Sequence, residues 1–314
     1  MRILNGLFAA AFCCLFVAVV RSSAADINNG AKKNDPQSFV ETQRIRIPES
    51  EARWALTGYG QERFKERILE NLKNVPGPRD LYGYYKRGEL EIRFSGKLGS
   101  STTAVYDSFH RTDAIMLSRK HVEKTMRFLL SEGYSEDRAE DIAGRLWVSR
   151  VAHETAHAAD QRILKDKTNL KFIPRNIESE YHAMAVEARF SEYAIEGLDE
   201  ELVLGTQLGR IQKGVLRCWS MGSVACKRWI RSIYDEYFSV RDKDVSAEIE
   251  FYTEKARKAN DRLRIAQKQH SSPYTIGRLK REKQCYGEAV RFWSSADLKD
   301  IAACYYDQKL LKQD

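Results

Sequence analysis

The spacing of apolar and polar positions changes along the chain, and its first feature is an unbroken apolar run over residues 7–20. Arg2 precedes this run, and Arg21 and then small residues up to Ala25 follow it. A positive start, a short apolar centre and small residues before a cleavage point are typical of a signal peptide. We therefore expect a signal peptide over residues 1–25, cleavage near Ala25, and a secreted or otherwise extracytoplasmic protein.

After the signal, residues 26–48 show no clear period and contain two prolines, which favours a linker or flexible arm. Phe64, Ile68 and Leu72 then recur every four residues and predict a helix over residues 61–74. Beyond this helix, short stretches with strand-like patterns predict a small sheet. The predicted strands cover residues 90–94, 104–106 and 114–117.

The rest of the chain has the apolar period of helices. The predicted helices cover residues 121–132, 135–164, 177–195, 201–216, 223–239, 245–268, 276–290 and 296–311. The sequence therefore predicts an α+β fold that is predominantly helical. We expect one domain over residues 49–197, which holds the small sheet and the first helices, and a helical C-terminal domain over residues 198–314.

Residues 153–157 read HETAH and lie inside the predicted helix 135–164. Histidines four residues apart lie one helical turn apart on the same face, so His153 and His157 can bind one zinc ion. Glu154 lies beside the first of them and can accept a proton from a zinc-activated water, then pass it to a leaving amine. These residue types predict a catalytic zinc site that hydrolyses peptide bonds, with Glu154 as the general base.

A catalytic zinc ion commonly has three protein ligands, so one more ligand is needed. The next predicted helix carries Glu180 and Glu187, which lie seven residues apart on one face with the small Ala183 between them. We expect Glu180 to be the third ligand, and Glu187 is the alternative. If Glu180 binds the metal, Glu187 can orient His153 or His157 through the second ring nitrogen.

Further polar residues are candidates for supporting roles. Asp160 shares the helix face of the two histidines and can orient them in the same way, or lie in solvent. Hydrolysis also requires a hydrogen-bond donor for the oxyanion that forms on the substrate. The candidates for this donor are Tyr106, His110, His182 and Arg189.

The HETAH motif, followed by residues 180–183 that read EYHA, resembles the gluzincin group of zinc peptidases. In this group a glutamate on the helix after HExxH completes the zinc site, often with a small residue three positions later. Within the group the chain is most similar to small, poorly characterised bacterial metallopeptidases, and the resemblance covers residues 88–195. It implies a zincin-like core of one sheet and two helices, with residues 114–117 as the edge strand to which substrate backbone adds. Met184 stands where thermolysin-like members have an aspartate.

Outside the signal peptide the chain has four cysteines, an even number in a protein expected in an oxidising compartment. We expect the local pairs Cys218 with Cys226 and Cys285 with Cys304, although the sequence alone also allows the two other pairings. These bonds would staple neighbouring helices of the C-terminal domain.

The net charge of +8 belongs to a chain in which Lys and Arg are interleaved with Asp and Glu, so it does not favour nucleic-acid binding. After removal of the signal, no apolar stretch is long enough to span a membrane. The sequence therefore predicts a secreted peptidase with one zinc ion per chain and a peptide or protein substrate. The alternative is a non-enzymatic, secreted or envelope-associated binding or scaffold protein whose metal site is incidental or structural.

Overall fold

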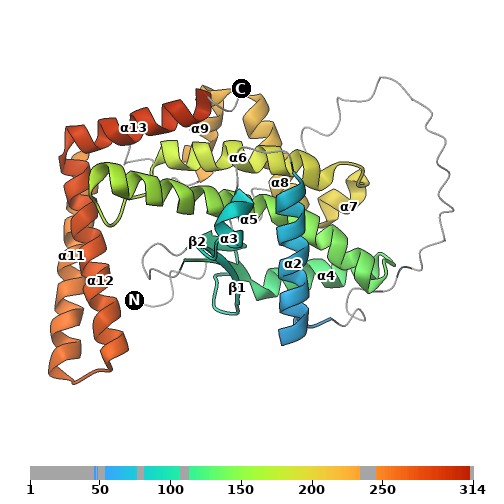
Figure 1. Ribbon diagram of the computed structural model, residues 1–314, viewed down its shortest axis with the longest axis horizontal. Helices are drawn as coiled ribbons and strands as arrows, with labels where there is room; N and C mark the ends of the chain where they lie inside the picture. The colour runs from blue at the N-terminus through green and yellow to red at the C-terminus, as the bar shows by residue number, and fades with distance from the viewer. Residues whose placement is uncertain are drawn as a thin grey trace.

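A computed structural model describes most of the chain after its N-terminal region, and Figure 1 shows how the elements are arranged. The described residues are 46, 48, 54–75, 81–106, 113–233 and 245–311. The predicted signal peptide, the linker apart from residues 46 and 48, and His110 lie outside the described residues. What the sequence indicates about them stays a prediction.

The described residues form a predominantly helical α+β fold, as predicted. The first helix among these residues, α2 (Gly58–Asn74), begins after Thr57, whose side chain accepts a hydrogen bond from the amide of Gly60. The apolar side chains that this helix buries are those of the four-residue repeat in the sequence. The short helix α3 (Leu81–Lys86) has no counterpart in the prediction, because six residues are too few to show a helical period.

Three short strands form one sheet: β1 (Glu91–Ser95), β2 (Ala104–Tyr106) and β3 (Ala114–Ser118). Their order is β1-β3-β2, with β1 parallel and β2 antiparallel to β3. The expectation that residues 114–117 form an edge strand is therefore wrong, because β3 is the central strand. It is buried along most of its length and pairs on both sides, whereas an edge strand leaves one row of backbone groups unpaired.

Two long helices run through the centre of the molecule. The helix α5 (Glu136–Thr168) begins after Ser135, whose side chain accepts a hydrogen bond from the amide of Arg138, and it ends at Asn169 in the left-handed conformation. Its buried residues lie on every face, so other elements surround it. The helix α6 (Ile177–Ile195) packs alongside α5 (Figure 1).

The main apolar core lies between the sheet, α2, α4 (Arg119–Ser131) and α5, with Trp147 of α5 as a large, fully buried side chain. A second core lies where α5 meets α6 and includes the small residues Ala152, Ala156 and Ala183. Short side chains at a helix contact reduce the distance between the helix axes. Side chains from α5 and α6 can therefore meet in one site.

Six further helices are described in the C-terminal region: α7 (Glu200–Gly205), α8 (Gln207–Ser220), α9 (Ser223–Ile233), α11 (Val245–Lys268), α12 (Pro273–Ser294) and α13 (Ala296–Leu311). The predicted helix 201–216 is two helices, because Thr206 caps the second one by accepting a hydrogen bond from the amide of Gly209. The helices α11 and α12 form a long hairpin, and α13 returns to pack on α5 and α6 (Figure 1).

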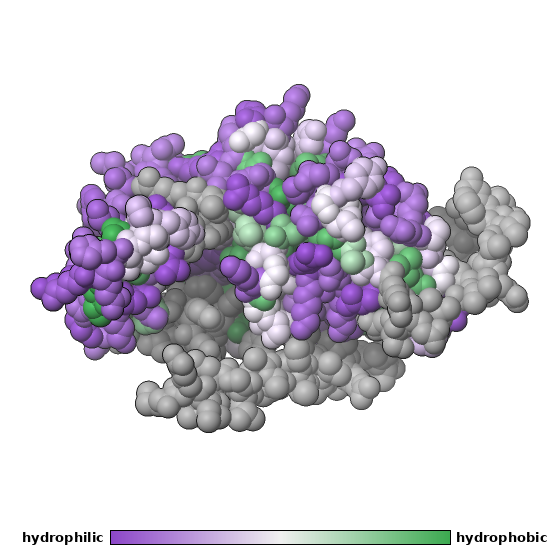
Figure 2. Space-filling view, turned by 90° about the horizontal axis from the view of Figure 1, so that it is seen from below, coloured by the Kyte–Doolittle hydropathy of each residue, from purple (hydrophilic) through white to green (hydrophobic). Residues whose placement is uncertain are grey.

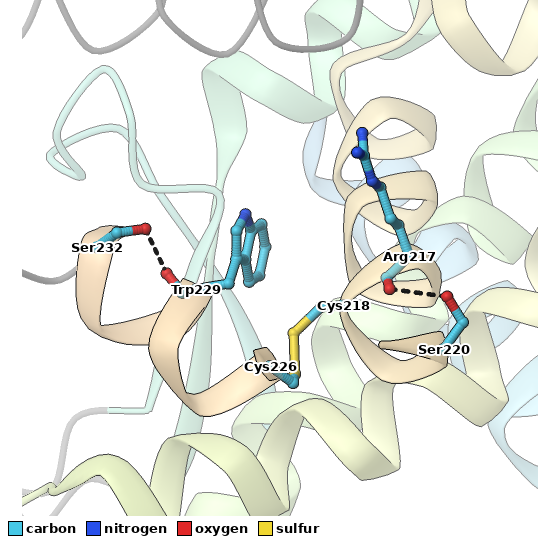
Figure 3. Close-up of a disulfide and its surroundings, with 6 residues drawn as sticks. All are labelled: Arg217, Cys218, Ser220, Cys226, Trp229 and Ser232. Atoms are coloured by element: carbon cyan, nitrogen blue, oxygen red, sulfur yellow. Dashed lines mark hydrogen bonds between the residues drawn. A yellow bond between two sulfur atoms is a disulfide. The ribbon is translucent and has the colours of Figure 1, made fainter. Parts of the chain in front are cut away.

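A disulfide joins Cys218 at the end of α8 to Cys226 on α9, as predicted (Figure 3). Both cysteines are buried in an apolar cluster that includes residues of α6. The second expected disulfide is not formed, since neither Cys285 nor Cys304 is part of a disulfide. Cys285 is half-buried against an apolar core, whereas Cys304 is exposed and accepts a hydrogen bond from Gln308. Closeness in sequence does not by itself produce the geometry that a disulfide requires.

The described residues on the face in Figure 2 are predominantly hydrophilic, with apolar residues near its centre and at a few other places. Within the described ranges, no helix is long and apolar enough to cross a membrane. Ion pairs such as Arg63 with Glu136 and Arg257 with Asp261 join partly exposed helices or neighbouring helical turns. Charges of opposite sign therefore lie close together, as their interleaving in the sequence indicates.

Candidate metal centre

Two buried histidines of α5 lie one turn apart, with the Nε2 atoms of His153 and His157 only 3.2 Å from each other. Glu180, in the first turn of α6, brings its carboxylate to both rings. Its Oε1 lies 3.3 Å from Nε2 of His157, and its Oε2 lies 3.6 Å from Nε2 of His153. One ligand atom from each of the three residues lies within 4.8 Å of the other two, close enough for all three to hold one metal ion.

The chemistry of these three side chains fits a metal ion. Oε2 of Glu180 is buried and accepts no hydrogen bond from any residue that the structure describes. A buried carboxylate oxygen without a donor is costly, and a cation would compensate its charge. Two imidazole nitrogens and one carboxylate oxygen form a donor set found in metal enzymes, including catalytic zinc sites with an open fourth position.

Glu187 lies on the opposite side of the first histidine from Glu180. Its Oε2 is 2.8 Å from Nδ1 of His153, the ring nitrogen that faces away from the metal site. Arg150 donates hydrogen bonds to both oxygens of Glu187, at 2.9 Å and 2.8 Å. A carboxylate in this position can orient a histidine that binds a metal, as expected from the sequence if Glu180 is the third ligand.

The charges around the centre decide the protonation of its residues. Burial and Arg150 lower the pKa of His153, but the carboxylates of Glu187 and Glu180 outweigh them and raise it to about 9. Burial is the main cause that lowers the pKa of His157. Burial also opposes ionisation of Glu180, yet the two histidines hold its pKa well below the usual value. A metal ion would therefore replace a proton on His153, because ligand histidines bind metals in the neutral form.

Glu154 follows His153 in α5 and reaches the strand β2. The backbone amide of Tyr106 donates to its Oε2 at 2.8 Å, and Arg175 donates to the same oxygen at 3.1 Å. Burial raises the pKa of Glu154, but Arg175, the histidines and Arg150 together lower it below the usual value. Glu154 is therefore an ionised carboxylate next to the candidate metal ligands, and the ionised form can accept a proton.

Asp160 and His182, two further residues selected from the sequence, contact each other. Nδ1 of His182 lies 2.7 Å from Oδ2 of Asp160, and the hydroxyl of Tyr305 donates to Oδ1 at 2.6 Å. All three residues are buried. The carboxylate of Asp160 on α5 thus connects this helix to α6 and α13. Asp160 orients His182 and neither of the two histidines predicted as zinc ligands.

Of the other candidate oxyanion donors, Tyr106 lies at the site and Arg189 does not. Tyr106 reaches the site through its backbone amide, while its side chain is buried in the apolar core. Arg189 lies on α6 with a partly exposed side chain, and no hydrogen bond or ion pair joins it to the described residues of the site. His110 lies outside the described residues.

Three residues around the site were not identified from the sequence: Arg150, Arg175 and Tyr305. Arg150 precedes Glu154 by four residues, a spacing that signals an ion pair on one helix face. Arg175 lies in the connection between α5 and α6, and Tyr305 follows its partner Asp160 by 145 residues. No sequence period links these last two to the motif, because only folding brings them to it.

The arrangement can hold a divalent metal ion through three side chains, beside an ionised carboxylate that can take up a proton. Such a centre can activate a small molecule such as water. No protein-family model, curated protein or solved structure matches the chain. Conclusions about function therefore rest on the geometry of this centre.

Proposed function

We propose that the chain is a zinc-dependent peptidase of the gluzincin type, with one zinc ion held by His153, His157 and Glu180. The observation that carries the proposal is the convergence of these three buried side chains next to the ionised Glu154. Zinc is the metal that such a donor set most commonly holds when the reaction is hydrolysis. The support from Glu187 behind His153 adds the oriented histidine that zinc enzymes use.

The chain's own residues account for the proton transfers of peptide hydrolysis. When bound, a zinc ion would polarise the substrate carbonyl and lower the pKa of a water molecule. Glu154 accepts the proton that the water loses as its oxygen bonds to the carbonyl carbon, and the carbonyl π electrons move onto the carbonyl oxygen. The carbon–nitrogen bond then breaks with its electron pair going to nitrogen, which takes the proton from Glu154.

An extracytoplasmic location is part of the same proposal. The buried disulfide between Cys218 and Cys226 is of a kind that persists in oxidising compartments. The apolar run over residues 7–20 has the pattern of a signal peptide. Both observations point to export, so the substrates would be peptides or proteins outside the cytoplasm.

Glu154→Gln tests the mechanism, because it removes the base and keeps the shape of the side chain. The purified protein should contain one zinc per chain by mass spectrometry of the metal and should cleave fluorescein-labelled casein. The variant should keep its zinc and lose the cleavage by a factor of about 100 or more. Removing zinc with a chelator and restoring it should abolish and recover the wild-type activity. Full activity in the variant would refute the role of Glu154.

A second candidate function is a non-enzymatic binding or scaffold protein with a structural metal. Its supporting observation is the burial of the centre, since the side chains of His153, His157, Glu154 and Glu180 are each no more than 3% exposed. This function predicts that zinc raises the melting temperature while no peptide is cleaved. Cleavage that disappears in Glu154→Gln would exclude it.

A further inference from the structure

Arg175 is a partly exposed residue that contacts the candidate metal centre. It lies in the connection from α5 to α6, one residue before Asn176, the N-cap of α6. The side chain of Gln161 on α5 holds this connection: its Oε1 accepts from the amide of Ile173 at 3.2 Å, and its Nε2 donates to the carbonyl of the same residue. The backbone that carries Arg175 is therefore anchored to both helices of the site.

The guanidinium of Arg175 extends across the centre. It donates to Oε2 of Glu154 at 3.1 Å, and its second terminal nitrogen lies 3.7 Å from Oε1 of Glu180. It thus contacts both the proposed base and a proposed metal ligand. A carbonyl group that reacts at this centre has to lie within reach of the same two residues.

Arg175 also differs from the other cation of the site in its exposure to solvent. Its side chain is 34% exposed, whereas that of Arg150 is 12% exposed and is bonded to Glu187 from behind His153. Of these two cations, Arg175 is therefore the one that solvent reaches more readily. Arg150, in contrast, supports the site from within the fold.

We propose that Arg175 is a catalytic residue that donates hydrogen bonds to the substrate carbonyl oxygen as it becomes an oxyanion. The inference rests on the proposed peptidase function. In the step described above, the carbonyl π electrons move onto oxygen while Glu154 takes the proton of the water. Arg175 stabilises the resulting negative charge, and the charge returns to the carbonyl when the carbon–nitrogen bond breaks.

A guanidinium suits this role because it carries five N–H donors in a plane and stays charged throughout the reaction. It can keep one hydrogen bond to Glu154 while another N–H turns to the substrate oxygen. Charge-assisted hydrogen bonds are the stronger class, and a fixed donor needs little reorganisation when the charge develops. Loss of one such donor typically reduces kcat about 100-fold to 1,000-fold.

The test compares Arg175→Ala and Arg175→Lys with a matched control, Lys171→Ala, which removes a positive charge from an exposed position in the same connection. The sites at which the wild type cleaves casein provide the sequence of a fluorogenic peptide. Hydrolysis of this peptide then provides kcat and KM. We expect Arg175→Ala to lower kcat about 100-fold or more with a smaller change in KM, and Arg175→Lys to restore part of the loss. Lys171→Ala should behave as the wild type.

Zinc affinity, measured by competition with a chelator, separates this role from a structural one. A donor role predicts that Arg175→Ala binds zinc as tightly as the wild type or about tenfold more tightly, because one positive charge near Glu180 is removed. A positioning role predicts weaker zinc binding and a lower melting temperature, and this result would overturn the inference. Wild-type kcat in a zinc-loaded Arg175→Ala protein would also overturn it, and leave the peptidase function intact. Absence of cleavage by the wild type would instead refute the proposed function, and the inference with it.

Discussion

Replacing Glu187 by glutamine removes one negative charge from the buried group that supports His153 and leaves the size of the side chain unchanged. Glu187 is fully buried, accepts two hydrogen bonds from Arg150, and lies 2.8 Å from Nδ1 of His153. In the variant, Arg150 stays largely buried and keeps its ion pair with Glu154, but it faces a neutral amide in place of the Glu187 carboxylate. The histidine loses the carboxylate behind it. Both the stability of the fold and the affinity for the metal should therefore fall.

The two losses have different magnitudes. Removing one charge from a buried ion pair lowers the free energy of unfolding by about 3–5 kcal/mol. For Glu187→Gln we expect a loss near the lower end, about 3 kcal/mol, because the amide oxygen of glutamine can still accept a hydrogen bond from Arg150. Loss of a residue that orients a metal ligand reduces metal affinity about 10-fold to 100-fold. Glu180→Gln should reduce zinc affinity by a larger factor, because it changes a residue that would touch the ion.

The assay has two parts, and Glu192→Gln is the matched control because Glu192 is an exposed glutamate on the same helix. Urea unfolding of the metal-free proteins provides the free energy of unfolding, and competition with a chelator provides the zinc affinity. The control should match the wild type in both. Loss of zinc in Glu187→Gln together with unchanged affinity in Glu180→Gln would show that the roles of the two glutamates are reversed.

Three further predictions concern other parts of the structure. Tyr305→Phe removes the donor to the buried Asp160 and should lower the free energy of unfolding by about 1.5–3 kcal/mol in urea unfolding. Replacing Cys218 and Cys226 together by serine opens a short loop and should cost about 2–3 kcal/mol, and an unchanged melting temperature would contradict this. In the metal-free protein the pKa of His153 is raised to about 9. The protonated ring therefore adds its full contribution to the free energy of unfolding below pH 6.5, and this contribution is lost as the pH rises through 9. Zinc should abolish this dependence in thermal melts at pH 6.5–9, since the coordinated ring no longer takes up the proton.

Much of the fold follows from local patterns that the sequence displays. The repeat of Phe64, Ile68 and Leu72 predicts α2 because all three side chains are buried: Phe64 and Ile68 enter the main core, and Leu72 enters the second one. The division of the predicted helix 201–216 depends on a cap at Thr206, a local signal that an apolar period does not reveal. The position of β3 in the middle of the sheet does not follow from any local pattern, because strand order results from contacts between segments that are distant in sequence.

Cys285 and Cys304, which form no disulfide, illustrate the same limit. The even number of cysteines indicated two bonds, and one of them is formed. Whether two cysteines pair depends on the distance and direction of their side chains, which the packing of α12 and α13 decides. Their separation in the sequence does not contain this information.

The sequence by itself determined that His153 and His157 share one face of a helix with Glu154 beside them, because the helical period fixes neighbours one turn apart. It also placed Glu180 and Glu187 on one face of the next helix, where either could approach the histidines. Only the tertiary structure decided between them: the offset of α6 along α5 brings Glu180 to the Nε2 atoms and Glu187 to Nδ1 of His153. The same packing brought in residues that no local pattern connects to the motif, namely Arg175 from the connection between the helices and Tyr305 from α13. The physical reason is that helix periodicity acts over a few residues, whereas the relative placement of two helices depends on the whole core that packs them together.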